Sequence, residues 1–322
     1  MRMQRFLLLR LGISGWCILL LMQSCTHRSG IKTTEQEPVA YSLNGTPLFP
    51  PVESEASKHR KDSLLQIAEQ EYRRDSTQPD NIIWYGRRLA YLSRYPEAIA
   101  IYTKGLKAHS QSPELLRHRG HRYISIRKFD DAIADLNQAA NIMRGSPVQI
   151  EPDGVPNRLN VPLSTLQFNV WYHLGLAYYL KGDYGNAIIA YDSCMYYSTN
   201  PDLLCATTDW YYMSLMRNGN TDRAGELLNL ITPKMEVIEN DGYLQRLLMY
   251  KGLMSPDSLL QFDQITEENE LNIITQGYGV AFYLELQGDT ARARAIRESI
   301  LKTNYWSAFG YIAAEADRVR KK

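Results

Sequence analysis

The residues with the greatest capacity for chemistry form one short run, 117–123, which reads Arg-His-Arg-Gly-His-Arg-Tyr. On a helix with about 100° between residues, its basic and imidazole side chains cover roughly 200° of the helix surface. A helix packed between neighbours cannot keep that much surface in water. Some of these groups therefore need buried partners, because an unpaired buried charge is costly.

The irregular segment 144–166 is the best source of such partners. Its four prolines and two glycines exclude a long helix. Its polar residues are Glu151, Asp153, Asn157, Asn160 and Ser164. Further polar groups stand on the flanking helices, namely Arg87, Arg88, Asn169 and His173. We expect the segment to fold back over these helices.

Three interpretations of this cluster stay open. The first is a structural network in which arginines clamp the segment. The second is a pocket where Arg87, Arg117 and His121 meet an anionic or carboxylate-bearing ligand. The third is an active site that uses His118 or His121 with Glu151 or Asp153 as acid, base or metal ligands.

No complete metal motif and no catalytic signature is present, so we assign no catalytic residue, metal ligand or cofactor. Whether the protein is an enzyme stays open, and the residues favour a non-enzymatic role. The candidate binding residues are Arg87, Tyr91, Arg117, His118, His121, Arg122, Glu151, Asp153, Asn157, Asn160, Asn169, Tyr172 and His173.

The elements that position the cluster are clearest in residues 168–195, which predict two helices separated by a turn at 181–183. The apolar stripes of the two helices are Trp171, Leu174, Gly175 and Tyr178, then Ala187, Tyr191 and Cys194. We expect Gly175 and Ala187 to lie where the helices cross, because a large side chain there would force the backbones apart.

The pattern recurs, since Gly86 and Gly120 are 34 residues apart, as are Ala98 and Ala132. Weaker copies cover 211–228 and 280–300. A 34-residue period with small residues at the crossing and aromatic residues beside it resembles the tetratricopeptide repeat. The resemblance implies an all-α fold, a right-handed α-solenoid of antiparallel helix pairs. Segment 144–166 is one long loop insertion between the second and third pairs, and 306–320 predicts a C-terminal capping helix.

Tetratricopeptide proteins bind extended peptides on the inner, concave side of their first helices, and the resemblance implies the same surface here. Inter-repeat packing is the alternative role for the aromatic residues expected there, Tyr91, Tyr172, Tyr179, Tyr278 and Phe282. The family's clamp for two carboxylates is not present, because the comparable positions hold Ile83, Arg87, Arg117 and His121.

The N-terminus predicts export. Arg2 and Arg5 precede an apolar stretch, 6–22, and residues 1–24 read as a secretory signal. The sequence Leu-Met-Gln-Ser-Cys at its end resembles the lipobox of bacterial lipoproteins, which implies lipidation of Cys25. The alternatives are other signal cleavage or an uncleaved anchor, although 17 residues span only about 26 Å. We expect a polar tether at 25–57, with some order near 41–51, and the solenoid at 58–322.

The 322-residue chain is 44% hydrophobic and 22% charged, as in a soluble globular protein. Its formal charge of +1 falls to −2 once the three arginines of the signal are removed, so nucleic acid is not an expected partner. Export would permit a disulfide between Cys194 and Cys205, but both positions suit small buried side chains.

The sequence therefore predicts a protein- or peptide-binding scaffold lipoprotein of the bacterial cell envelope, held in the membrane through Cys25. We expect the outer membrane or the periplasmic face rather than the cytoplasm. The alternatives are an envelope enzyme or a small anion- or glycan-binding protein built on residues 117–122, and a structural assembly factor. Self-association of the repeats stays open.

Overall fold

The computed structural model describes residues 37–320, except 153, 155, 261–264 and 267–268. The expected signal peptide, residues 1–24, the lipidation site at Cys25 and the first part of the expected tether lie outside the described residues. Residues 37–322 form one compact unit, and the description below concerns that unit alone.

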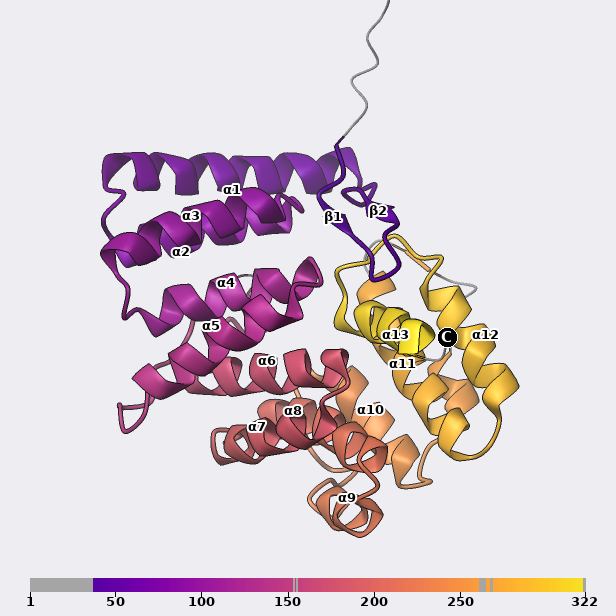
Figure 1. The fold of residues 1–322 in the computed structure, drawn as a ribbon. Helices are drawn as coiled ribbons and strands as arrows, with labels where there is room; N and C mark the ends of the chain where they lie inside the picture. The colour runs from indigo at the N-terminus through magenta and orange to yellow at the C-terminus, as the bar shows by residue number, and fades with distance from the viewer. Residues whose placement is uncertain (1–36, 153, 155, 261–264, 267–268, 321–322) are drawn as a thin grey trace, which may run out of the picture. The chain divides into compact units, whose positions relative to one another are not determined.

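The unit is built almost entirely from helices (Figure 1). Two short strands, β1 (Ala40–Tyr41) and β2 (Pro47–Leu48), form an antiparallel hairpin. The helices are α1 (Glu55–Arg74), α2 (Pro79–Tyr91), α3 (Tyr95–Ala108), α4 (Pro113–Ser125), α5 (Phe129–Ile142), α6 (Leu166–Lys181), α7 (Tyr184–Tyr196), α8 (Pro201–Arg217), α9 (Thr221–Leu228), α10 (Asp241–Tyr250), the 3₁₀ helix η1 (Pro256–Leu259), α11 (Glu270–Leu286), α12 (Thr290–Ile300) and α13 (Phe309–Arg320).

Five helix pairs occupy the predicted positions: α2 with α3, α4 with α5, α6 with α7, α8 with α9, and α11 with α12. Their ends follow local rules. Proline opens α2, α4 and α8, where its missing N–H costs nothing. Gly182 ends α6 with φ of 89°, a left-handed conformation that glycine adopts without strain. The predicted all-α architecture is confirmed.

The small residues lie where the helices of each pair cross, as predicted. A Cβ added to Gly175 would lie 2.7 Å from the ring of Tyr191, and Ala187 is fully buried. Gly120 has the same relation to Leu136, and Gly86 to Tyr102. The glycines therefore allow the large side chain of the second helix to lie against the backbone of the first.

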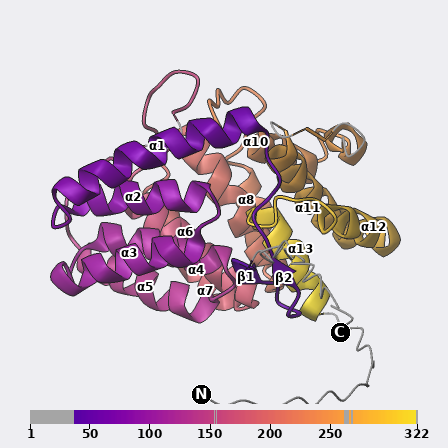
Figure 2. The same ribbon diagram turned by 90° about the horizontal axis from the view of Figure 1, so that it is seen from above.

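The C-terminal helix is buried more deeply than expected for a capping helix at the end of a solenoid. Helix α13 packs against α6, α11 and α12 (Figures 1 and 2). Its residues Ala313, Ala314 and Glu315 are fully buried. The reason is that η1 replaces a second long helix after α10, and the chain then returns towards the earlier pairs. The last helix thus fills space between pairs instead of closing the end of a row.

The hairpin explains the order expected near residues 41–51. Leu43 donates its backbone N–H to Glu315, and Trp306 donates its indole N–H to the Phe49 carbonyl at 2.6 Å. The hairpin segment is therefore docked on the C-terminal part of the fold.

Cys194 and Cys205 are both free and buried, which agrees with their expected role as small side chains. The Cys194 thiol lies 3.2 Å from the Thr207 hydroxyl. Within residues 37–320, apart from the gaps given above, no helix is long and apolar enough to cross a membrane.

Candidate functional site

The predicted cluster is assembled where segment 144–166 meets α2, α4 and α6. The two ends of the segment are tied together, since Glu151 donates its backbone N–H to the Ser164 carbonyl at 3.1 Å and Leu166 donates to Gln149 at 2.8 Å. Asn169 holds the same end by donating to the Ser164 hydroxyl at 3.0 Å. As expected, the segment folds back over the first helices of the first three pairs.

Glu151 is the centre of the cluster. Its Oε1 lies 3.0 Å from Arg117 Nη2 and 3.8 Å from His118 Nε2. Arg117 also donates Nη1–H to His118 Nδ1 at 2.9 Å, so the imidazole proton belongs on Nε2, the nitrogen that faces Glu151. Exposed fractions of 8% for Glu151 and Arg117 and 4% for His118 make this a buried triad.

Burial governs the protonation of the triad. Desolvation lowers the pKa of Arg117, and the nearby Glu151 opposes this effect. Desolvation, followed by the charge of Arg117, holds the pKa of His118 well below its ordinary value of 6.5. At neutral pH the imidazole is therefore uncharged, and it cannot serve as a second cation for an anionic ligand.

Two arginines of α2 hold the next stretch of the segment. Arg87 donates to the Pro152 carbonyl at 2.8 Å, and Arg88 donates to the Gly154 carbonyl at 3.2 Å. Gly154 lies so close to Tyr91 that a Cβ would clash with the phenol oxygen. The absence of a side chain at position 154 thus permits this contact.

A cleft of about 300 Å³ lies beside the triad. It is walled by the start of α2, the start of α4 and the segment. Its lining residues are Pro79, Asp80, Ile83, Trp84, Arg87, Glu114, His118, Gln149, Ile150, Glu151, Pro152 and Leu166.

The inner face of α4 and α6 beyond the triad is covered by the chain itself. The rings of His121 and His173 lie 4.3 Å apart, and Phe309 at the start of α13 lies 5.4 Å from the first and 5.8 Å from the second. Tyr172 shares a 3.0 Å hydrogen bond with Tyr243 of α10. These predicted binding residues therefore pack against returning segments.

The remaining predicted residues lie apart from the triad. Arg122 lies over the ring of Tyr95. Asn157 donates to Glu239 and to the Val161 carbonyl at 2.6 Å each, and Asn160, with φ of 52°, is exposed on the segment. Asp153 lies outside the described residues. Arg122, Asn157 and Asn160 are not among the residues that line the cleft.

The structure also shows the partner of Arg119 and the surroundings of the five aromatic residues. Arg119, which also needed a partner, pairs with Asp135 of α5 at 2.7 Å and not with the segment. Of the five aromatic residues, four are buried in packing between helix pairs, which favours the packing alternative for Tyr172, Tyr179, Tyr278 and Phe282. Tyr91 stays partly exposed.

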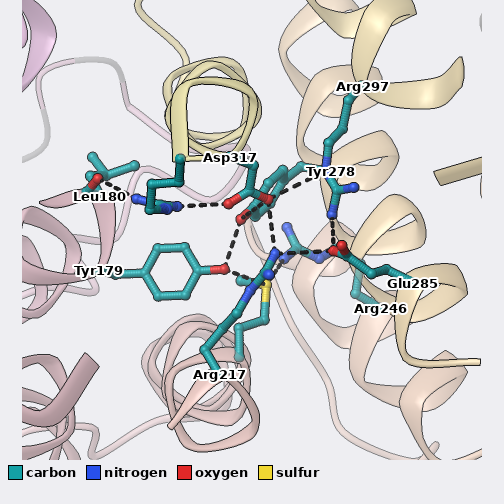
Figure 3. A network of polar contacts seen from close by, with 10 residues as sticks. Tyr179, Leu180, Arg217, Arg246, Tyr278, Glu285, Arg297 and Asp317 are labelled. Carbon is teal, nitrogen blue, oxygen red and sulfur yellow. Dashed lines mark hydrogen bonds and ion pairs between the residues drawn. The ribbon is translucent and has the colours of Figure 1, made fainter. Parts of the chain in front are cut away.

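Sequence reasoning missed a second buried network, around Asp317 of α13 (Figure 3). Asp317 accepts from Arg217 of α8 at 2.9 Å, from Arg320 at 2.6 Å and from Tyr278 of α11 at 3.3 Å. Tyr278 in turn shares a 2.7 Å hydrogen bond with Tyr179 of α6.

Glu285 extends this network by accepting from Arg217 at 3.2 Å and from Arg297 of α12 at 2.5 Å. The network joins five helices, α6, α8, α11, α12 and α13, so it serves to fix α13. In the sequence, this network is indicated only by the charged residues on helices that pack against neighbouring helices on two sides.

In the described part of the chain, no group of three or more histidine, cysteine, aspartate or glutamate side chains could hold a metal ion.

Comparisons with known proteins agree with this architecture. A family model described as "Tetratricopeptide repeat" matches residues 168–201, which contain α6 and α7. No curated protein matches the sequence. The chain thus contains a tetratricopeptide repeat, and the fold is an all-α solenoid of helix pairs of this type.

Several solved structures are similar at low sequence identity. A tetratricopeptide repeat protein from Parabacteroides merdae ATCC 43184 is 14% identical, with 81% of this chain and 94% of that chain covered and a TM-score of 0.46. MamA protein is 16% identical, with 61% and 87% covered and a TM-score of 0.41. YrrB, a tetratricopeptide repeat protein with an unusual peptide-binding site, is 11% identical, with 80% and 100% covered and a TM-score of 0.41.

Proposed function

We propose that this protein is a non-enzymatic scaffold of the bacterial cell envelope that binds a segment of a protein partner at the cleft between α2, α4 and residues 149–152. The observation that carries the proposal is the position of the cleft on the inner side of the first helix pairs. Farther along this inner side, α10 and α13 cover α4 and α6, whereas the cleft stays open.

The contacts of the triad favour a protein partner over the small anionic ligand. Arg117 is already neutralised by Glu151, and Arg87 already donates to a backbone carbonyl. An anion entering the cleft would have to displace one of these contacts and approach three carboxylates, those of Asp80, Glu114 and Glu151. The arginines are thus used to hold the segment that forms one wall of the cleft.

Membrane attachment through Cys25 is the second part of the proposal. It is supported by the basic start, the apolar stretch and the Leu-Met-Gln-Ser-Cys ending in the sequence. Metabolic labelling with an alkyne fatty acid tests it. Wild type should incorporate the label and fractionate with membranes, and Cys25→Ser should lose both properties. Label on Cys25→Ser would contradict this part.

Binding is tested by cross-linking in the native bacterium and purification through a C-terminal tag. Ile150 lines the cleft and is 68% exposed, so Ile150→Asp should lose a stoichiometric partner without unfolding the protein. Ile189 on α7 is 63% exposed and distant in sequence, and Ile189→Asp is the matched control. A partner retained by Ile150→Asp would place the binding surface elsewhere.

A further inference from the structure

One carboxylate oxygen of Glu151, a residue that lines the cleft, has no donor. Arg117 and His118 both approach Oε1 of Glu151. Oε2 is buried and has no hydrogen-bond partner among the described residues. Because a buried charged acceptor without a donor is unfavourable, a donor brought by a ligand would improve this arrangement.

The charges of the lining favour a cationic ligand. Three carboxylates line the cleft, those of Asp80, Glu114 and Glu151, as do two basic residues, Arg87 and His118, of which His118 is uncharged at neutral pH. The Arg87 guanidinium donates to Pro152 and lies 4.6 Å above the Trp84 ring, which keeps it against one wall. Arg117 neutralises one of these carboxylates, that of Glu151. The cleft therefore retains a negative surplus that attracts a cation.

The walls suit an aliphatic stem. Ile83, Trp84, Ile150 and Leu166 supply apolar surface between the carboxylates. A volume of about 300 Å³ stands at the lower end of the range for ligand pockets, which suits a single long side chain. A side chain with an apolar stem and a charged head matches this combination.

The geometry at Glu151 also selects the type of head group. A guanidinium binds a carboxylate best as a fork that uses both oxygens. Here Arg117 occupies Oε1, and Oε2 is the oxygen that lacks a donor. An ammonium is a compact point charge and can use one oxygen.

We propose that the cleft binds a lysine side chain from the partner's segment, with the ammonium group donating to Glu151 Oε2 and the stem against Ile83 and Trp84. This inference rests on the proposed function, because it names the residue that the scaffold takes from its partner.

The test is a titration of the full chain with Nα-acetyl-lysine N-methylamide. Binding is monitored by the NMR chemical shift of the Trp84 indole N–H. We expect saturable shifts with lysine, binding at least tenfold weaker for the Nε-acetylated analogue, and weaker binding for the arginine analogue. Added salt should weaken the lysine complex. Equal binding of the acetylated analogue, or no saturable shift with lysine, would overturn the proposal.

Two variants locate the interaction. Glu151→Gln keeps an oxygen for Arg117 and should weaken lysine binding at least tenfold, whereas Glu226→Gln, on the exposed surface of α9, should not change it. Asp80→Asn, on the exposed rim, should weaken binding several-fold and leaves the triad intact if Glu151→Gln fails to fold. Unchanged lysine binding by a folded Glu151→Gln protein would contradict the assignment. If Glu151→Gln does not fold, unchanged lysine binding by Asp80→Asn would contradict it instead.

The outcome separates the two proposals. A partner captured through Ile150 without lysine binding would overturn the lysine inference and leave the scaffold function standing. Lysine binding without any captured partner would support the ligand class and contradict the scaffold function.

Discussion

Arg127 and Glu315 are 188 residues apart in the sequence and form a buried ion pair, with Nη2 and Oε2 separated by 2.7 Å. Arg127 lies in the turn between α4 and α5, and Glu315 lies on α13. The same guanidinium donates to the carbonyls of Ser125 at 2.6 Å and Trp306 at 2.9 Å. This pair therefore connects the second helix pair to the end of the chain.

Replacing one member of this ion pair should lower the free energy of unfolding. Arg127→Met or Glu315→Leu alone leaves an uncompensated buried charge, for which a loss of about 3–5 kcal/mol is expected. The double variant should recover much of that loss, because it leaves neither charge buried. Urea denaturation of all four proteins measures the coupling. Additive losses in the double variant would show that the two residues do not act as a pair.

The helix crossing should not tolerate a larger residue. Gly175→Leu would place its side chain against the Tyr191 ring, and overpacking of this kind costs about 1–3 kcal/mol or more. Ala187→Leu should have a similar effect, because Ala187 is fully buried. Gly185→Ala is the control, since no atom lies within 4 Å of an added Cβ. Melting temperatures that stay unchanged for Gly175→Leu would refute the repeat register.

Loss of the Glu151 carboxylate should loosen segment 144–166. Glu151→Ala leaves Arg117 buried without its counter-charge and removes the tie to α4. We expect faster cleavage of the segment by thermolysin, while Arg158→Ala, at an exposed position of the same segment, should be cleaved like wild type. Equal cleavage rates for Glu151→Ala and wild type would mean that the ion pair does not hold the segment.

Acid should destabilise the inner face through its histidines. Burial lowers the pKa of His118, His121 and His173 well below 6.5, so the folded state stays neutral where the unfolded chain takes up protons. Their contribution is complete above pH 6.5 and is lost as the pH falls below it. Each histidine contributes a slope of up to about 1.4 kcal/mol per pH unit.

Urea denaturation between pH 7.5 and 5.5 measures this slope. His121→Gln/His173→Gln should lose less stability on acidification than wild type, whereas His59→Gln, exposed on α1, should behave like wild type. Identical slopes for wild type and the double variant would exclude these two histidines as the source.

The helix pairs and the folding of segment 144–166 over the Arg/His run of α4 could be predicted, because both follow from local rules. A 34-residue period sets the pairs, and a helix with charges over roughly 200° of its surface requires an acidic partner from a nearby polar loop. Both features depend on residues close in sequence, where few arrangements compete.

The position of α13 could not be predicted in the same way. Arg217 and Asp317 are 100 residues apart, and their contact depends on the short η1 and the return of the chain after α10. Each charge alone is compatible with a solvated helix face. The covering of His121 and His173 by Phe309 has the same origin, which is why residues expected on an open surface are packed.

The most direct test of the central claim is site-specific photo-cross-linking in the native bacterium. A photoreactive residue replaces Ile150 at the cleft in one protein and Ile189 on α7 in the other, two isoleucines of similar exposure. The proposed function predicts one discrete protein adduct from position 150 and none from position 189. The same adducts from both positions, or none from position 150, would contradict it.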